Sequence, residues 1–518
     1  MPDLHRELEA KYDLDDTSEL PDLAGPLTQA LGTTVVEGAV AEHVLEATYF
    51  DTADHALAAA RITLRRRKGG TDAGWHLKLP APDGARQEVR LPLGRATRTV
   101  PAPLRALAWT RTRGAALVPV ATITTHRSVR TLLDPDARVL AEVADDRVEA
   151  RRMLPLAGSG SAVTAPQTWR ELEVELVDGD ADVLAAAADV LAAHGVRPAA
   201  TGSKLARVLG DAVPQPAPRK ALTPRSGAGA VVLAHVAAQV EAIAAQDPQV
   251  RLDAPDSIHK MRVATRRLRS ALKTFRPLFR EEVTRPLREE LKWLAAELGA
   301  ARDAEVMRER LLRAVAAEDP ALLLGPAGQG IDAPLSQAYA DAHRAVVAGL
   351  DGERYRALLG QLHAFVAEPP FTGRARRRAR EVLPGRVAKS WKQLAGLVER
   401  AGAAPAGPER DVLLHEARKA AKQVRYAAEA LSGVFGADAT ALAGAAEAVQ
   451  EVLGEHQDSV VTRQRLRELA AATDSPAAAF ALGRLHALED AHGERTEHRF
   501  AEVWARASHR SLRRWLAR

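Results

Sequence analysis

The chain contains no cysteine among its 518 residues. This absence excludes disulfides, thiolate metal sites and cysteine nucleophiles, and it fits a protein of the reducing cytoplasm. The N-terminus lacks a basic segment followed by an apolar one, and no uninterrupted apolar run is long enough to cross a bilayer. We therefore expect a soluble, cytoplasmic protein with no membrane partner.

Aromatic residues are scarce, at 4% of the chain, although hydrophobic residues reach 46%. Much of the apolar content is alanine, which favours closely packed helices over much of the length. The formal net charge is only +5, from 72 basic and 67 acidic residues. The net charge therefore does not indicate a partner, and only the local arrangement of charged residues can do so. A chain of 518 residues is too long for one ordinary domain, and we expect two or three.

Short segments in which charged and apolar residues alternate dominate the chain up to about Leu209. The first is "HRELEAKYDL", and similar alternation occurs in "ITLRRRK", "WHLKLP", "RQEVRL" and "RELEVEL". Alternation with a period of two is typical of β-strands with one apolar and one polar face. One helix-like stretch, "DVLAAAADVLAAHG", precedes Val196. The pattern predicts an α+β domain rich in antiparallel strands.

The polar faces of these strands are segregated by sign of charge. Acidic faces carry Glu7 and Glu9, or Glu171, Glu173 and Glu175, whereas mostly basic faces carry Arg65 and Arg67, His76 and Lys78, or Arg86 and Arg90. If the sheet closes into a barrel, these faces meet in its lumen. Carboxylates bind Mg²⁺ or Mn²⁺, and arginine and lysine bind phosphate oxygens. Such a lumen would hold a metal-chelated polyphosphate. The alternative is an open sheet with solvated charged faces, which explains the segregation less well.

The character of the sequence changes after Asp211, where proline, glycine and basic residues mark a linker. We assign residues 1–210 to the first domain, 211–226 to the linker and 227–518 to a second, all-helical domain. The breaks "GPAGQGIDAP" and "EPPFTG" are expected to be loops between helices.

The second domain contains an internal repeat. "IHKMRVATRRLRSAL" and "LHEARKAAKQVRYAA" each place bases at +3, +7 and +10 from a histidine, and each is followed by a matching segment, "LGAARDAEVMRERL" or "LGEHQDSVVTRQRL". So many shared positions indicate a duplicated helical unit, over about 227–366 and 375–518. The offsets put each histidine and its bases on one helix face, where an anion would relieve their repulsion. A solvated basic face is the alternative, and its appearance twice makes it less probable.

The first domain resembles the CYTH family, the triphosphate tunnel metalloenzymes. "ELEAK" fits the family signature E-x-E-x-K, and "TLRRR", "HLK", "THRSVR", "AEVADDRV", "ELEVE" and "GSKLAR" follow in the family's order. The resemblance implies an eight-stranded antiparallel tunnel and hydrolysis of inorganic triphosphate, thiamine triphosphate or RNA 5′-triphosphates, or cyclisation of ATP.

The resemblance also implies roles for individual residues. Glu9 and Lys11 would be catalytic, with Lys11 orienting water or stabilising the leaving group. The implied metal ligands are Glu7, Glu9, Glu171 and Glu173, with Asp145 or its neighbour Asp146, of which we assign Asp145; the segment "AEVADDRV" that supplies this aspartate also supplies Glu142. The implied phosphate-binding residues are Arg65, Arg67, Lys78, Arg127 and Lys204, to which we add Arg86 from its basic strand. Family members often carry a lysine close to the Arg127 position, where this chain has Thr125 and His126.

The second domain resembles the CHAD domain, an all-helical module of two related four-helix bundles that often follows CYTH in bacterial chains. The resemblance implies binding of inorganic polyphosphate along a basic channel, which on the repeat would comprise His259, Arg262, Arg266, Arg269, His415, Arg418, Lys422 and Arg425. It also implies an association with polyphosphate granules in the cytoplasm.

Together these observations predict a Mg²⁺- or Mn²⁺-dependent inorganic triphosphatase with a polyphosphate-binding helical domain. The main alternative is a non-catalytic protein that binds or senses polyphosphate. Nucleic acid is an unlikely partner, because few aromatics are available for base stacking and no groove-reading motif is evident.

Overall fold

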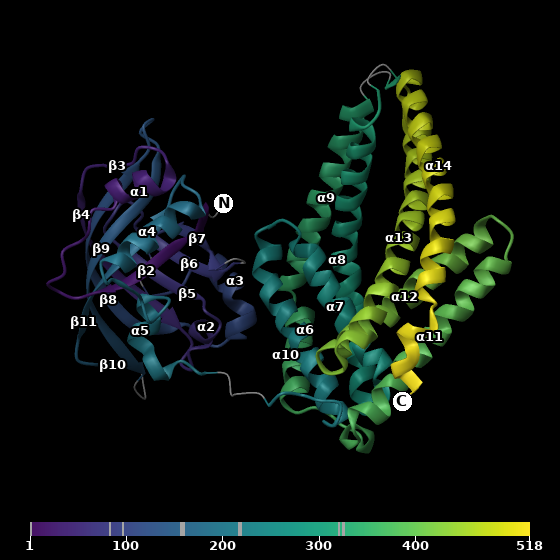
Figure 1. The fold of residues 1–518 in the computed structure, drawn as a ribbon, viewed down its shortest axis with the longest axis horizontal. Coiled ribbons are helices and arrows are strands. Elements are labelled where there is room, and N and C mark those ends of the chain that lie inside the picture. The colour runs from purple at the N-terminus through teal and green to yellow at the C-terminus, as the bar shows by residue number, and fades with distance from the viewer. Residues whose placement is uncertain are drawn as a thin grey trace. The chain divides into compact units, whose positions relative to one another are not determined.

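The computed structural model describes residues 3–81, 84–95, 98–155, 161–215, 220–319, 322–323 and 327–517. The chain divides into two compact units, Met1–Pro218 and Arg219–Arg518, which we describe separately (Figure 1). The predicted linker includes residues 216–219, which lie outside the described residues.

The first unit is an antiparallel sheet that curls into a tunnel. Its pairing order is β1-β7-β6-β5-β4-β8-β9-β11-β2-β12, with β10 on β9 and β3 on β8. The strands are β1 (Asp3–Glu7), β2 (Glu9–Leu14), β3 (Val36–Glu37), β4 (Ala41–Asp51), β5 (Thr63–Lys68), β6 (Gly74–Pro80), β7 (Arg86–Pro92), β8 (Val118–Leu133), β9 (Val139–Pro155), β10 (Ser161–Val163), β11 (Gln167–Leu176) and β12 (Arg197–Pro198).

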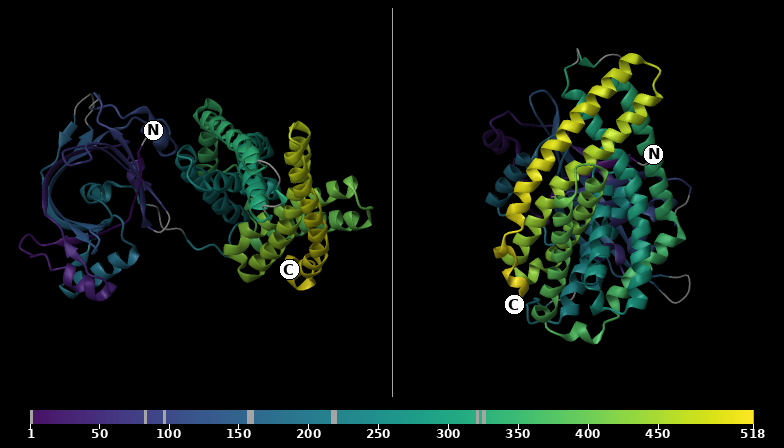
Figure 2. Two further views of the ribbon diagram at one scale, coloured as in Figure 1. Left: turned by 90° about the horizontal axis from the view of Figure 1, so that it is seen from above. Right: turned by 90° about the vertical axis from the view of Figure 1, so that its right-hand side faces the viewer.

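Closure of the sheet follows from its first segment. β1 pairs with β7 and β2 pairs with β11, yet only Leu8 separates β1 from β2. The two ends of the sheet therefore meet in one bent segment, and with β1 and β2 counted together eight long strands form the wall. The left view of Figure 2 shows this wall as a ring. The predicted α+β tunnel is confirmed.

Short helices cover the outside of the tunnel and fill one part of its inside. They are α1 (Ala24–Leu31), α2 (Ala56–Ala59), α3 (Ala102–Thr112), α4 (Ala181–Ala193), α5 (Lys204–Leu209) and the 3₁₀ turn η2 (Gly210–Ala212). The outward apolar faces of β2, β9 and β11 pack on α1 and α4, as the alternation predicts. By contrast, Leu205 and Leu209 of α5 pack among residues of the lumen face, such as Ile123. This contact places Lys204, the first residue of α5, inside the tunnel.

The second unit is all-helical in its described residues. Its helices are α6 (Ala228–Arg251), α7 (Ser257–Thr274), α8 (Glu281–Ala316), α9 (Ala327–Asp351), α10 (Glu353–Ala367), α11 (Ala379–Ala403), α12 (Pro408–Phe435), α13 (Ala437–Ala472) and α14 (Pro476–Ala507), with 3₁₀ turns η3 (Arg276–Leu278), η5 (Gly373–Arg376) and η6 (Arg510–Ala517). The predicted loop "EPPFTG" lies between α10 and η5, but the prediction for "GPAGQGIDAP" is wrong from Ala327 onward, where α9 begins. Proline is tolerated there at Pro334, inside the helix.

The duplication is visible as two successive four-helix sets. Helices α6 to α9 form one set and α11 to α14 the other, with α10 between them, and α7 contacts α12 where the sets meet (Figures 1 and 2). The predicted all-helical second domain is confirmed, and one apolar cluster joins α8 and α9 of the first set to α13 and α14 of the second.

One helix of the described part, α6, is long and apolar enough to cross a membrane by length and composition, with a mean hydropathy of 1.6. It packs against α7, α10 and α11, and a core helix of a bundle passes the same test. The sequence-based expectation of no membrane partner therefore stays a prediction.

Candidate active-site tunnel and basic channel

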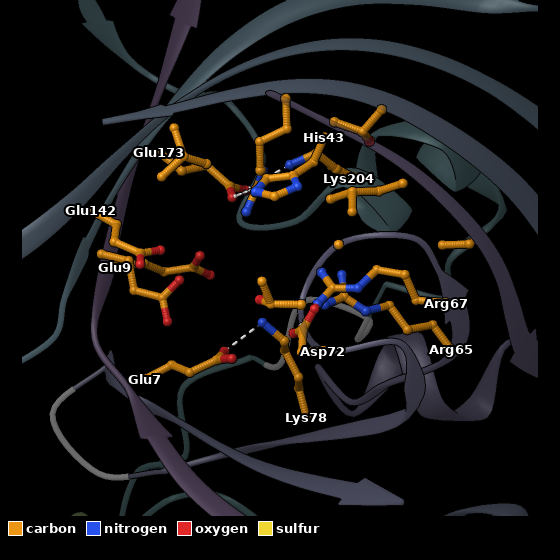
Figure 3. Close-up of a pocket in the computed structure, with 18 of the residues that line it drawn as sticks. Glu7, Glu9, His43, Arg65, Arg67, Asp72, Lys78, Glu142, Glu173 and Lys204 are labelled. Carbon is orange, nitrogen blue, oxygen red and sulfur yellow. Dashed lines mark hydrogen bonds and ion pairs between the residues drawn. The ribbon is translucent and has the colours of Figure 1, made fainter. Parts of the chain in front are cut away.

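The tunnel encloses a cavity of about 460 Å³ whose walls carry opposite charges. Figure 3 shows the carboxylates of Glu7, Glu9 and Glu142 facing the cavity from one side and Arg65 and Arg67 from the other. The charged strand faces that the sequence segregates by sign thus share one lumen, and the open-sheet alternative is excluded.

The acidic wall is built by strand register. Glu175 of β11 lies opposite Glu9 of β2 on one side and opposite Glu142 of β9 on the other. Within the described residues neither Glu142 nor Glu175 forms an ion pair, and directly opposed like charges are destabilising. Burial, together with Glu7 and Glu9, raises the pKa of Glu175 to about 7. A divalent cation bound by these oxygens would remove that repulsion, so the donor set fits a hard metal ion.

The choice between Asp145 and Asp146 is settled by the same register. Asp146 lies opposite Glu171 and Arg127 on the inner face, whereas Asp145 lies opposite Leu172 on the outer face. The Asp145 carboxylate accepts hydrogen bonds of 2.9 and 2.8 Å from Arg170, outside the cavity. The assignment of Asp145 as a metal ligand is therefore wrong.

Asp146, Glu171 and Glu173 form a second group of carboxylates close enough to share an ion. Here, however, the Lys204 ammonium lies 2.7 Å from an oxygen of each of the three. These carboxylates raise the pKa of Lys204 although burial opposes them. Lys204 thus serves as the internal cation of this group, and the geometry does not support its predicted role in gripping phosphate.

Glu171 is also displaced from its predicted role. It is absent from the described lining of the cavity, and its second oxygen accepts a 2.6 Å hydrogen bond from the Trp169 indole. Glu175, four residues further along the same face, lines the cavity where Glu171 is predicted to do so. The alternating "ELEVEL" segment does not distinguish the three glutamates; their register against Glu9 does.

The basic wall contains most of the predicted phosphate-binding residues. Arg65, Arg67, Lys78, Arg86 and Arg127 all line the cavity. Lys78 donates to Glu7 at 2.5 Å and lies 3.8 Å from Glu88, while Arg65 lies 3.8 Å from Glu88. Arg86 donates to the main-chain oxygen of Gly202 at 3.1 Å.

Arg127 is more firmly held than the other bases. Its guanidinium donates to both oxygens of Asp146, at 2.7 and 2.6 Å, and also to Glu173. These carboxylates raise its pKa against the opposing effect of burial.

Several lining residues were not predicted to be part of the site. They include His43, Tyr49, Asp72, Arg90 and Glu175. Arg90 and Glu175 share strand faces with predicted residues, so period-two alternation could have found them. His43 and Tyr49 lie on β4, whose inner face carries no run of like charges, and Asp72 lies in a turn; no sequence pattern marks these three.

Lys11 lies within the acidic wall. Its ammonium is 3.0 Å from Glu9 and also contacts Glu173. Burial lowers the pKa of Lys11, but Glu173 and Glu9 outweigh it and raise the pKa above its usual value. Lys11 therefore remains a cation, suited to orienting oxygens and unsuited to removing a proton.

In the helical unit the repeat produces the same local arrangement twice. Arg262 of α7 lies 3.3 Å from Asp303 of α8, and Arg418 of α12 lies 3.7 Å from Asp458 of α13. A glycine lies beside each arginine: a Cβ added at Gly299 would make an ordinary contact of 3.6 Å with the Arg262 guanidinium, whereas one at Gly454 would lie only 3.2 Å from that of Arg418. The Asp positions shared by the two segments thus contact the +3 arginine in both repeats, and the glycine is sterically required only at Gly454.

The two basic stripes meet around a second cavity. It measures about 360 Å³ and is lined from α7 by Arg266, Arg269 and Lys273 and from α12 by Lys419 and Lys422. Burial, followed by Arg266, Arg418 and Arg262, lowers the pKa of Lys422 to about 6. We call this cavity with Arg262 and Arg418 the basic channel. Lys273 continues the α7 spacing and could have been predicted from it.

The other predicted channel residues are placed differently. Arg425 lies 2.7 Å from both Glu429 and Glu447, so its charge is neutralised and its predicted role in the channel is not supported. His415 hydrogen-bonds Gln457 at 2.9 Å. His259 and His415 both have a lowered pKa, chiefly through burial, and neither lines the cavity.

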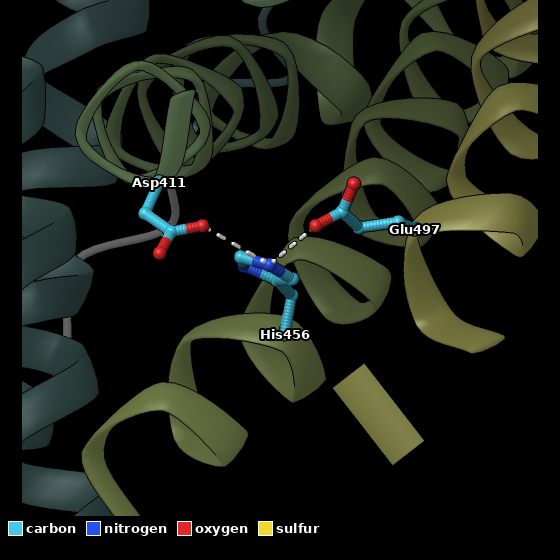
Figure 4. A group of neighbouring side chains, drawn as sticks. All are labelled: Asp411, His456 and Glu497. Atoms are coloured by element: carbon cyan, nitrogen blue, oxygen red, sulfur yellow. Dashed lines mark hydrogen bonds and ion pairs between the residues drawn. The ribbon is translucent and has the colours of Figure 1, made fainter. Parts of the chain in front are cut away.

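A further group of potential metal ligands joins α12, α13 and α14 (Figure 4). His456, which is buried, lies 3.1 Å from Glu497 and 3.5 Å from Asp411. Arg410 also lies 3.2 Å from Glu497. Because Arg410 already faces Glu497 and His456 contacts both carboxylates, the group is adequately explained as a polar link between three helices.

Comparison with known proteins agrees with both halves. Residues 5–208 match the CYTH domain family, and residues 234–467 match the CHAD domain family. The uncharacterized protein Rv2226 of Mycobacterium tuberculosis is 38% identical over 483 residues, which cover 92% of this chain and 90% of the relative. The chain therefore belongs to the family of proteins in which a CYTH domain is followed by a CHAD domain.

Two solved structures are similar to part of the chain. PptA from Streptomyces chartreusis is 23% identical, with a TM-score of 0.45, and the match covers 54% of this chain and 100% of PptA. The CHAD domain from Ricinus communis is 27% identical, with a TM-score of 0.44, over 58% of this chain and 96% of that domain.

Proposed function

We propose that the tunnel is a metal-dependent triphosphatase that cleaves inorganic triphosphate to pyrophosphate and phosphate, and that the basic channel binds inorganic polyphosphate. The observation that carries the proposal is the pair of opposed walls around one cavity. A carboxylate wall, in which Glu142 and Glu175 have no described cationic partner, faces a basic wall that contains Arg65, as a metal–triphosphate complex requires.

Glu7, Glu9, Glu142 and Glu175, with Glu173 beside them, would hold Mg²⁺ or Mn²⁺. When bound, such an ion neutralises phosphoryl charge and activates water. The arginines and Lys78 would bind phosphate oxygens and hold the chain of phosphates in line. Lys11, kept charged by Glu173 and Glu9, would orient the oxygens that react. In the overall reaction water adds to a terminal phosphorus, the bridging P–O bond breaks, and pyrophosphate leaves.

The lining favours an inorganic substrate over a thiamine or nucleoside triphosphate. Tyr49 and His43 provide the only rings among the described lining residues, and the Tyr49 hydroxyl is hydrogen-bonded to Arg65. A base or thiamine ring would normally stack on such a surface. Because Tyr49 is buried, His43 offers the more accessible ring among the described lining residues, and recognition rests mainly on the phosphates.

The test is phosphate release from inorganic triphosphate, thiamine triphosphate and ATP, with Mg²⁺, Mn²⁺ or no metal. We expect inorganic triphosphate to be the best substrate and turnover to require metal. Glu142→Gln should raise the metal concentration needed for half-maximal activity by about tenfold, the typical effect of losing one charged contact. Glu149→Gln on the same strand, where Glu149 is exposed and pairs with Arg151, is the matched control.

The competing function is that of a non-catalytic polyphosphate sensor. Tight binding of triphosphate without phosphate release under any metal condition would favour the sensor and contradict the enzyme. The channel is tested separately by long-chain polyphosphate binding to wild type and to variants neutralised at Arg262 and Arg266, or at Arg418 and Lys422. Equal affinity and equal salt dependence in all three proteins would rule out the channel as the binding site.

A further inference from the structure

The turn between β5 and β6 folds back toward the tunnel. Gly69 and Gly70 both adopt positive φ angles, +77° and +72°. A Cβ at Gly69 would lie 2.0 Å from the main-chain oxygen of Val44, so only glycine permits this close approach to β4. The turn thus has a defined path, and it delivers Asp72 to the cavity wall.

The Asp72 carboxylate contacts Arg67, one of the two arginines of the "TLRRR" motif that line the cavity. It forms an ion pair with Arg67, and the Arg90 guanidinium is 3.9 Å away. The main-chain oxygen of Asp72 is held 2.9 Å from Nε2 of His76. Figure 3 shows Asp72 among Arg65, Arg67 and Lys78, the groups assigned to phosphate.

This contact competes with the function proposed for Arg67. The Arg67 side chain is 8% exposed and that of Asp72 is 26% exposed, and both line the cavity, so the carboxylate occupies a donor of the guanidinium within the site. A guanidinium binds carboxylate and phosphate oxygens with the same fork geometry. A phosphate group therefore competes with Asp72 for the guanidinium nitrogen of Arg67 that forms the ion pair.

We propose that Asp72 is a displaceable internal anion that occupies the phosphate-binding position of Arg67 and sets the affinity and selectivity of the tunnel for anions. The inference rests on the proposed function of the tunnel. A triphosphate carries several negative charges and contacts several bases at once, so it displaces one carboxylate. A small anion such as sulfate has fewer contacts and is excluded more strongly. Asp72 therefore acts as a specificity-determining residue that does not take part in bond cleavage.

The test compares Asp72→Asn with Asp136→Asn, which removes the same charge from an exposed turn away from the cavity. For Asp72→Asn we expect the KM for inorganic triphosphate to fall about fivefold, the scale of one partly exposed ion pair, with kcat unchanged. Inhibition by sulfate should strengthen by a larger factor. Asp136→Asn should leave all three quantities unchanged.

Other outcomes would overturn the inference. A lower kcat would mean that Asp72 acts in the reaction, and an unchanged or higher KM would mean that the ion pair only holds the turn. If the wild type releases no phosphate, the proposed enzymatic function fails, and triphosphate binding is then measured by calorimetry in a protein with Arg266 and Lys422 neutralised. In that background, the protein with Asp72→Asn must bind triphosphate more tightly than the protein that retains Asp72. If it does not, the inference fails as well.

Discussion

Replacing Lys422 by arginine should abolish a pH dependence of polyphosphate binding that the wild type possesses. Lys422 lies between Arg266 and Arg418, and burial with these neighbours lowers its pKa to about 6. Near neutral pH the free protein therefore carries an uncharged amine at this position. A bound polyanion favours the ammonium form, so binding takes up one proton whenever the pH lies above the pKa of the free protein.

The size of the effect follows from that pKa. With a value of about 6 in the free protein, half of the molecules have a charged Lys422 at pH 6, and about 1% do at pH 8. If only the charged form binds well, the affinity falls about 50-fold over this interval, which corresponds to about 2.3 kcal/mol. Arginine stays protonated throughout, so Lys422→Arg should show an affinity nearly independent of pH.

The assay is a titration with long-chain polyphosphate at constant ionic strength, because only the terminal phosphates of a long chain titrate near neutral pH. His259 and His415 have lowered pKa values and are neutral over most of the interval. Parallel pH profiles for wild type and Lys422→Arg would refute the reasoning. The same pKa also makes folding stability depend on pH. Above pH 6 the unfolded chain keeps the Lys422 proton and the folded chain does not, so the free energy of unfolding should rise as the pH increases above 6.

Two further predictions use matched pairs. Asp146→Asn should reduce triphosphate turnover at least tenfold, because Arg127 and Lys204 lose a buried charged partner. Asp145→Asn should keep turnover and lower the free energy of unfolding by about 1 kcal/mol, because it weakens only the contact with Arg170. Equal turnover in the two variants would contradict the assignment of Asp146 to the lumen and Asp145 to the outer face. Gly454→Ala should weaken polyphosphate binding severalfold, because the added Cβ displaces the Arg418 guanidinium. Gly444→Ala on the same helix has open space around it, so it should leave binding intact and raise the free energy of unfolding by about 0.5–1 kcal/mol. Polyphosphate affinity and thermal unfolding are measured for both variants.

The sequence predicts the fold well because its patterns are long. Alternation over several residues fixes which face of a strand is apolar, and the charges on the opposite faces must then meet when the sheet closes. The repeat similarly predicts two sets of helices with matching basic faces. These features depend on periodicity, which a single chain displays directly.

The site is predicted less completely because it depends on register. Within "ELEVEL" every glutamate shares one face, but only pairing with Glu9 and Glu142 separates Glu175 from Glu171. For the adjacent Asp145 and Asp146, a shift of one residue decides between the outer face and the lumen. Asp72 comes from a turn whose path depends on glycine conformation and on contact with β4. Ion pairs between helices, such as the one between Arg425 and Glu447, are tertiary contacts, and residue spacing within one helix cannot predict them.

The two units differ in which charge they leave uncompensated. In the tunnel, Lys11, Lys78, Arg127 and Lys204 all have carboxylate partners, and the described carboxylates without partners are Glu142 and Glu175. In the channel the imbalance is reversed, because Arg266 forms no ion pair with a described carboxylate. Under the proposed function, the tunnel therefore takes up triphosphate together with a metal ion, whereas the channel requires only an anion.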